Sequence, residues 1–186
     1  MRSPVVLLPL ALLTAAPLVA AETVAVPAFR SVELRGGGHV VLRPGPAQRV
    51  TIVNGSTQFT QIRVDRNGKL KIDACNERCP HRYDLRVEIQ SPHVPDVAIA
   101  GGGAIAASAG FAPQPQLSAA VNGGGVIDVR ALRALSVSAA VNGGGQIRTG
   151  PARSLSAAIN GGGEVRYAGN PVTAVAIRGG GAVHRD

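Results

Sequence analysis

The acidic and histidine residues, which could serve as general acids, general bases or metal ligands, are few and scattered. Only two pairs among the eleven Asp and Glu residues lie four positions apart, Asp73 with Glu77 and Asp84 with Glu88. Glycoside hydrolysis needs two carboxyl groups flanking one bond, whereas Asp84 and Glu88 on a strand would share a solvated face with Arg82 and Arg86. The histidines fall on four different segments, at His39, His81, His93 and His184. These residues predict no catalytic site and no metal or cofactor site.

Basic residues outnumber the acids, with 19 Lys and Arg and a net charge of +8 at pH 7. Such a balance favours anionic partners, although a general contribution to solubility is an alternative. Six arginines occupy positions that, in strands with alternating inward and outward residues, point away from the aliphatic residues. Their planar guanidinium groups suit phosphate and carboxylate. The candidate anion-binding residues are Arg63, Arg82, Arg86, Arg130, Arg148 and Arg166.

Six Gly-Gly-Gly triplets recur within one pattern, in which an apolar residue and any residue precede the glycines and any residue and an apolar residue follow. The copies span residues 34–40, 99–105, 121–127, 141–147, 159–165 and 177–183. The last five begin 22, 20, 18 and 18 residues apart, a spacing typical of a stacked solenoid. A phosphate-binding loop would require a helix after the glycines, and no helical pattern follows any triplet. The triplets are therefore predicted to be corners or flattened strands where neighbouring coils approach closely.

Alternation of apolar and polar residues on both sides of each triplet predicts strands. One inward column is expected from Val121, Val141, Ile159 and Ile177, and a second from Ile127, Ile147, Val165 and Val183. A structural ladder is expected from Asn122, Asn142 and Asn160, whose amides could pair from coil to coil and which tolerate a left-handed backbone. The prediction is an all-β, parallel β-helix-like solenoid with Gly-rich bends, in which residues 22–96 form less regular strands and residues 97–186 form the repeat coils.

Residues 1–21 have the pattern of a secretory signal peptide. A positive charge at Arg2 precedes an apolar run that ends in small residues. A transmembrane anchor is the alternative, but Pro9, Pro17 and the small residues disfavour it. No second apolar stretch is long enough to span a bilayer. The chain from residue 22 is therefore expected to be a single exported domain without a transmembrane segment, in the periplasm or at the cell surface.

The only cysteines, Cys75 and Cys79, lie in the segment DACNERCPH. An exported protein meets an oxidising compartment, so a disulfide closing this short loop is favoured. The alternative is a metal site from Cys75, Cys79 and His81, joined by Asp73 or Glu77. That alternative lacks the second ligand pair of standard zinc sites.

The chain resembles an exported bacterial family, the head GIN domain of auto-transporter adhesins. The similarity lies in FRSVELRGGGHVVLRPG (29–45), in the VTIVNG and IRVDRNGKLKI segments, in the repeated LSAAVNGGG units, and in the closing VRYAGNPVTAVAIRGGGAV (165–183). Family members usually have Gly-Ser-Gly where this chain has Gly-Gly-Gly. The resemblance implies an all-β solenoid and supplies no catalytic residues.

Export, the repeat and the basic charge together predict a non-enzymatic envelope or surface protein that binds or scaffolds through a long β face. Anionic envelope polysaccharide or lipopolysaccharide is the expected partner, and export makes nucleic acid the least expected one. Self-association is also expected, because open ends of a repeat stack expose strand edges. The alternative is an enzyme acting on acidic polysaccharide, since parallel β-helices also support that chemistry.

Overall fold

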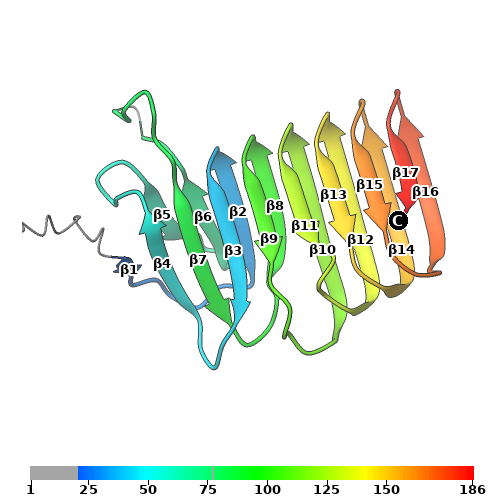
Figure 1. The fold of residues 1–186 in the computed structure, drawn as a ribbon, viewed down its shortest axis with the longest axis horizontal. Coiled ribbons are helices and arrows are strands. Elements are labelled where there is room, and N and C mark those ends of the chain that lie inside the picture. The colour runs from blue at the N-terminus through cyan, green and yellow to red at the C-terminus, as the bar shows by residue number, and fades with distance from the viewer. Residues whose placement is uncertain (1–20, 77) are drawn as a thin grey trace, which may run out of the picture.

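The computed structural model describes residues 21–76 and 78–186, and all of its regular elements are β-strands (Figure 1). The first sheet has nine strands, in the spatial order β1 (Glu22–Val24), β4 (Arg49–Asn54), β7 (Arg86–Ser91), β3 (His39–Pro44), β9 (Ala104–Ala107), β11 (Val126–Val129), β13 (Gln146–Thr149), β15 (Glu164–Tyr167) and β17 (Ala182–Arg185). The second has eight, in the order β16 (Val172–Arg178), β14 (Ala152–Asn160), β12 (Ala134–Gly143), β10 (Gln114–Gly123), β8 (Asp96–Gly101), β2 (Ser31–Gly36), β6 (Lys69–Asp73) and β5 (Gln61–Val64).

From β8 onward the chain alternates between the two sheets. β8, β10, β12, β14 and β16 lie in the eight-stranded sheet, and each is followed across a glycine triplet by a strand of the nine-stranded sheet. We call one such pair, for example β10 with β11, a repeat unit. Successive units pair in parallel within both sheets. The predicted all-β class is confirmed, with two mostly parallel sheets.

The repeat units are in strict register, which aligns the predicted aliphatic columns. Val121 pairs with Val141, Val141 with Ile159 and Ile159 with Ile177. The second column, from Ile127 to Val183, is aligned in the same way. The side chains of both columns meet between the sheets in one hydrophobic cluster as far as Ile159 and Val165. Burial of this aliphatic surface is the main contribution to stability in such a thin core.

The glycine triplets form the corners between the sheets, and the first and third positions require glycine for different reasons. The first of each triplet has a positive φ, for example +120° at Gly143, which favours glycine. The third lies against the preceding unit: a Cβ on Gly145 would come 2.4 Å from Cγ1 of Val121 and 2.7 Å from the carbonyl oxygen of Gly125. The middle glycine, Gly144, has no neighbour within 4 Å of such a Cβ. The close approach of neighbouring units, as predicted, explains why the third residue of the triplet is glycine.

The N-terminal strands are not stacked in chain order. β2 and β3, which flank the first glycine triplet, lie directly beside β8 and β9. β6 and β7 extend the two sheets beyond them, so the chain leaves the stack after β3 and returns to it at β6. β4, β5 and β1 are then added antiparallel at this end. The region is therefore a continuation of the same two sheets, closed by antiparallel strands.

The opposite end of the stack is open, and one sequence expectation fails there. β16 and β17 are the last strands of the two sheets, at the right of Figure 1. Ile177 continues the Val141 column in register, but its side chain is 42% exposed, against 2% for Val141 and Ile159. The prediction that Ile177 lies inside the core is wrong, because β16 is the edge strand of its sheet among the described residues.

Within the described part of the chain, no helix has the length and apolar character needed to cross a membrane.

Candidate functional site

The outer face of the eight-stranded sheet carries regular rows of small residues over the repeat units. We call this surface the Ala/Asn face. Its central row is made by strand-to-strand neighbours with methyl side chains, and the row beside it continues with three asparagines. The central row consists of Ala98, Ala120, Ala140, Ala158 and Ala176, and the adjacent row of Ala100, Asn122, Asn142, Asn160 and Arg178. On the other side of the alanines, Ser118, Ser138 and Ser156 form a third row.

A hollow of about 620 Å³ lies along these rows. Small side chains produce it, because an alanine row between longer neighbours leaves an open trough across the strands. Glu33 and Arg178 are the only charged residues that line it. Rows on adjacent strands repeat about every 4.8 Å, so the same contacts are offered at each step. This geometry fits an elongated ligand that runs across the strands and has groups repeated along its length.

The asparagines of the predicted ladder are aligned from strand to strand on this face. Asn122, Asn142 and Asn160 lie in register and are exposed, but no hydrogen bond from a described residue reaches their amides. Positive φ angles in the described chain occur at glycines alone, so the left-handed corner residue is the glycine after each asparagine. The amides therefore remain available to an external ligand, each with two donors and one acceptor oxygen.

The same sheet face is charged over β2, β5 and β6, where the cations are paired with acids. Lys69 Nζ lies 3.0 Å from Glu33, and Lys71 Nζ lies 3.1 Å from Asp65. The pKa of Asp65 is lowered by the backbone N–H of Lys69 and then by the Lys71 ammonium. Asp73 accepts from Arg63 at 2.6 Å and lies 3.4 Å from Arg35. This part of the face offers little unpaired charge to a ligand.

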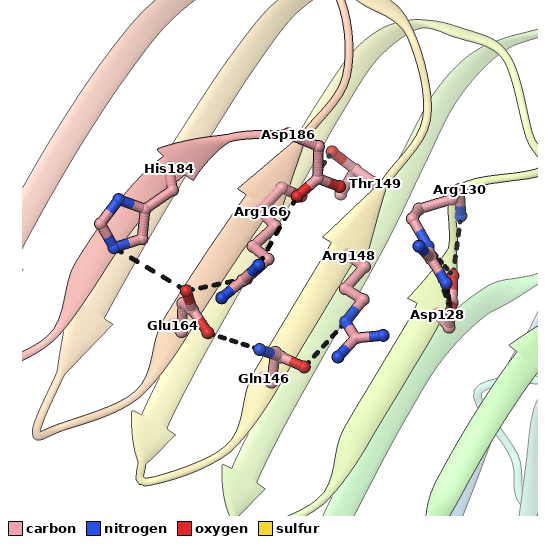
Figure 2. A network of polar contacts seen from close by, with 9 residues as sticks. All are labelled: Asp128, Arg130, Gln146, Arg148, Thr149, Glu164, Arg166, His184 and Asp186. Carbon is pink, nitrogen blue, oxygen red and sulfur yellow. Dashed lines mark hydrogen bonds and ion pairs between the residues drawn. The ribbon is translucent and has the colours of Figure 1, made fainter.

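The outer face of the nine-stranded sheet carries a second polar cluster, shown in Figure 2. Arg166 Nε donates to Glu164 at 2.8 Å, and Gln146 also donates to this carboxylate. Burial acts to raise the pKa of Glu164, but the hydrogen bonds from Gln146 and Arg166 outweigh it and lower the pKa. The network extends through His184, 3.8 Å from Glu164, and through Arg148, which donates to Gln146 at 2.8 Å.

At one side of this cluster, Arg130 and Asp128 form an ion pair with several contacts. Arg130 Nη2 lies 2.6 Å from Asp128 Oδ2, and Arg130 Nε lies 3.0 Å from Oδ1 (Figure 2). The hydrogen bond from the Arg130 side chain lowers the pKa of Asp128, and the carboxylate raises the pKa of Arg130. Charges in this network are nearly balanced, which weakens its attraction for an anionic ligand.

The six predicted anion-binding arginines thus have different environments. Arg130, Arg148 and Arg166 come together on the nine-stranded sheet (Figure 2). Arg86 is on β7 of the same sheet, Arg63 is on β5 of the eight-stranded sheet, and Arg82 lies in the loop before β7. Four of the six have carboxylate partners: Arg63 with Asp73, Arg86 with Asp84, Arg130 with Asp128 and Arg166 with Glu164. Parity predicted that the six arginines point away from the aliphatic residues, but it could not show that most of them already contact an acid.

The cysteine loop joins β6 to β7 and lies at the closed end. Cys75 and Cys79 form a disulfide with a Cα–Cα distance of 5.7 Å, the pairing that the sequence favours over a metal site. Within the loop, the backbone N–H of Asn76 donates to the carbonyl oxygen of Phe59 at 2.7 Å, and its side-chain amide donates to that of Gln58 at 2.8 Å. Of the other residues in the metal alternative, Glu77 lies outside the described residues. The described part of the chain brings together no group of three or more His, Cys, Asp or Glu residues suited to a metal ion.

The sequence analysis missed the Ala/Asn face as a candidate site, although its signal is visible. Each SAAVNGGG unit has two consecutive alanines, of which one must point inward and the other outward on a strand. Ala139 is buried in the core, and Ala140 is exposed on the outer face. Two or more such units in register place the outward alanines and asparagines in rows.

The fold and its exposed faces define a repetitive two-sheet domain with extended surfaces. A family model described as "Putative auto-transporter adhesin, head GIN domain" matches residues 28–114 and 114–171. The chain belongs to this family, as its glycine-triplet segments indicated.

Several solved structures are similar to this chain at low sequence identity. A "putative adhesin" from Bacteroides fragilis has 16% identity and a TM-score of 0.47, over 90% of this chain and 96% of that one. A "putative lipid binding protein" from Parabacteroides distasonis has 14% identity and a TM-score of 0.39, with the same coverage. A "putative cell adhesion protein" from Clostridium sporogenes has 12% identity and a TM-score of 0.39, over 89% and 98%. No curated protein matches the chain.

Proposed function

We propose that the protein is an exported, non-enzymatic binding protein of the bacterial envelope or surface, and that its two sheets are the faces of a β-solenoid scaffold. Its ligand is an anionic envelope polysaccharide, either free or as part of lipopolysaccharide. The observation that carries the proposal is the hollow on the Ala/Asn face, with three exposed amides in register along it. Membership of an adhesin family supports a binding role at the cell surface.

The chemistry of the face suits a sugar chain. Amide and hydroxyl rows on either side of the alanines can donate to and accept from sugar hydroxyls, and the alanine methyl groups can contact the apolar parts of the rings. The net charge of +8 brings an anionic chain to the protein. Arg178 at the end of the hollow supplies a guanidinium group that can bind a carboxylate or phosphate.

The alternative, an enzyme acting on acidic polysaccharide, finds no supporting observation. Such an enzyme needs two carboxyl groups facing one cleft. The described carboxylates instead contact cations, N–H groups or hydroxyls; for example, Glu88 pairs with Arg43, Glu22 with Thr57, and Asp96 with the backbone of Ser118.

The test is a binding titration of the purified exported protein against lipopolysaccharide, a polyuronate and a neutral glucan. We expect Ala140→Glu, which places a negative charge in the hollow, to weaken binding of the anionic ligands at least tenfold. Val126→Glu is the matched control, because it makes the same change of charge on the outer face of the other sheet. Binding should also weaken steeply as salt rises above about 0.1 M, where the Debye length falls below about 10 Å.

Two results would contradict the proposal. Equal weakening by Ala140→Glu and Val126→Glu would mean that charge alone decides binding and that the hollow is not the site. If Arg148→Gln abolished binding and Ala140→Glu did not, the ligand would instead occupy the arginine cluster of the nine-stranded sheet. Release of shortened sugar chains during incubation would overturn the non-enzymatic part.

A further inference from the structure

The open end of the stack exposes aliphatic residues that every earlier unit buries. Val175 follows Ala157 in register, and its side chain is 48% exposed, whereas Ala157 is 2% exposed. Both sheets end at this unit, so the edges of β16 and β17 are without a neighbour among the described strands. At this end, therefore, aliphatic residues of the core are exposed to solvent between the free edges of the two sheets.

Proteins usually protect such edges with charges, prolines or bulges. β16 carries one charged residue, Arg178 at its end, β17 ends with His184 and Arg185, and the pairing of β16 with β14 is regular over its whole length. The uncharged stretch of β16 from Val172 to Ile177 is suited to pairing with another strand through backbone hydrogen bonds.

A partner for this end must satisfy both edges at once. It must present two strand edges about 10 Å apart, with aliphatic side chains between them. Each repeat unit of the chain already presents two such strand edges to the next unit. The nearest example is the unit of β14 and β15, which pairs with β16 and β17. The same end of a second copy presents the same two edges and the same aliphatic residues, so a two-fold rotation makes the surface complementary to itself.

The closed end cannot take this role. β1 has three residues and β5 has four, and both are antiparallel additions. Glu22 on β1 is held by the hydroxyl of Thr57 at 2.7 Å, and Arg63 on β5 is paired with Asp73. Short edges that carry charges disfavour further strand pairing. Association through the open end therefore stops at two copies and does not continue into a fibre.

We propose that the exported protein forms a two-fold dimer through its open end, in which β16 and β17 of one copy pair with these two edges of the second copy. The two sheets then continue across the interface, and Val175, Ile177 and Val183 become part of one core. The dimer carries two Ala/Asn faces, which raises the avidity for a long or repetitive ligand. This inference does not depend on what the Ala/Asn face binds.

The test measures the mass of the purified exported protein by light scattering after gel filtration, over a range of micromolar concentrations. We expect twice the chain mass for the wild type and the single chain mass for Ile177→Asp. The matched control is Ala158→Asp, which places the same charge on the outer face of the neighbouring strand and should leave the dimer intact. A wild-type protein of single mass throughout, or one of mass above two chains, would overturn the proposal.

Hydrogen exchange of the wild type supplies a measurement that needs no variant. Those amides of residues 172–178 and 182–185 that point away from β14 and β15 should exchange slowly at high concentration and become at least tenfold faster on dilution below the dissociation constant. Amides of β12, which lies between two strands in either state, should not change. Exchange of residues 172–178 that does not depend on concentration would exclude a dimer through this edge.

Discussion

The two halves of the stack use the same two sheets but are stabilised differently. From β8 onward each unit repeats the last, with aliphatic columns inside and small neutral residues on the outer face of the eight-stranded sheet. In β1 to β7 the strands are rearranged in order, and their outer faces carry ion pairs such as Lys69 with Glu33 and Arg43 with Glu88. Regular repetition makes a long uniform face and leaves an open end, whereas the irregular strands close the other end.

The largest effect should come from breaking an inner column, and its size should depend on position along the stack. Val141→Asp buries an unpaired charge and should lower the free energy of unfolding by about 3 to 5 kcal/mol. Ile177→Asp is in the same column, but Ile177 is partly exposed, so in dilute protein the substitution should cost less than about 1 kcal/mol. Urea denaturation of both variants at low concentration measures the difference. Equal losses would mean that the open end is covered within the single chain.

A smaller effect is expected from the glycines of one corner. Gly145→Ala forces a methyl group against Val121 and the Gly125 carbonyl, so it should cost about 3 kcal/mol through overpacking. Gly144→Ala, its neighbour, meets nothing within 4 Å and should be neutral or slightly stabilising, because alanine restricts the unfolded chain. Thermal melts of the two variants provide the comparison. Similar losses at both positions would refute the close approach of units at the third glycine.

The sequence was sufficient to predict the repeat half because its signals are local and periodic. Alternation placed Val121 and Ile127 inside, and the spacing of the triplets placed them in register with the next unit. It could not predict that β2 lies between β8 and β6, because pairing among non-repeated strands depends on contacts between residues far apart in the chain. Nor could parity reveal the carboxylate beside Arg166, since side-chain partners depend on how neighbouring strands are placed.

The disulfide should contribute moderately to stability, and its effect on local hydrogen exchange should be confined to the irregular half. Closing so short a loop constrains the unfolded chain by at most about 2 kcal/mol in the chain-entropy model. The double variant Cys75→Ser/Cys79→Ser should therefore have a melting temperature a few degrees lower than the wild type. Reductant should lower the melting temperature of the wild type by the same amount and leave that of the variant unchanged. Hydrogen exchange should increase around residues 74–85, at the closed end, and stay constant in β12 and β14. A loss of exchange protection that extended through the repeat half would show that the loop stabilises the whole stack.

The smallest expected effect concerns the ion pair on the nine-stranded sheet. The hydrogen bond from Arg130 lowers the pKa of Asp128 in the folded protein below its value of about 3.9 in an unfolded chain. A depressed folded pKa stabilises the protein above the unfolded pKa, and this contribution is lost as the pH falls through the folded pKa. Because both side chains are partly exposed, at 50% and 29%, the pair should contribute less than about 1 kcal/mol at pH 7.

The variant Asp128→Asn isolates this contribution, since it keeps the shape of the side chain and removes its charge. Urea midpoints of wild type and variant should differ slightly at pH 7, and the difference should shrink as the pH falls below 4. High salt at pH 7 should reduce the difference as well, because the pair is partly exposed to solvent. A difference that persisted unchanged at pH 2 would assign it to packing rather than to the charge.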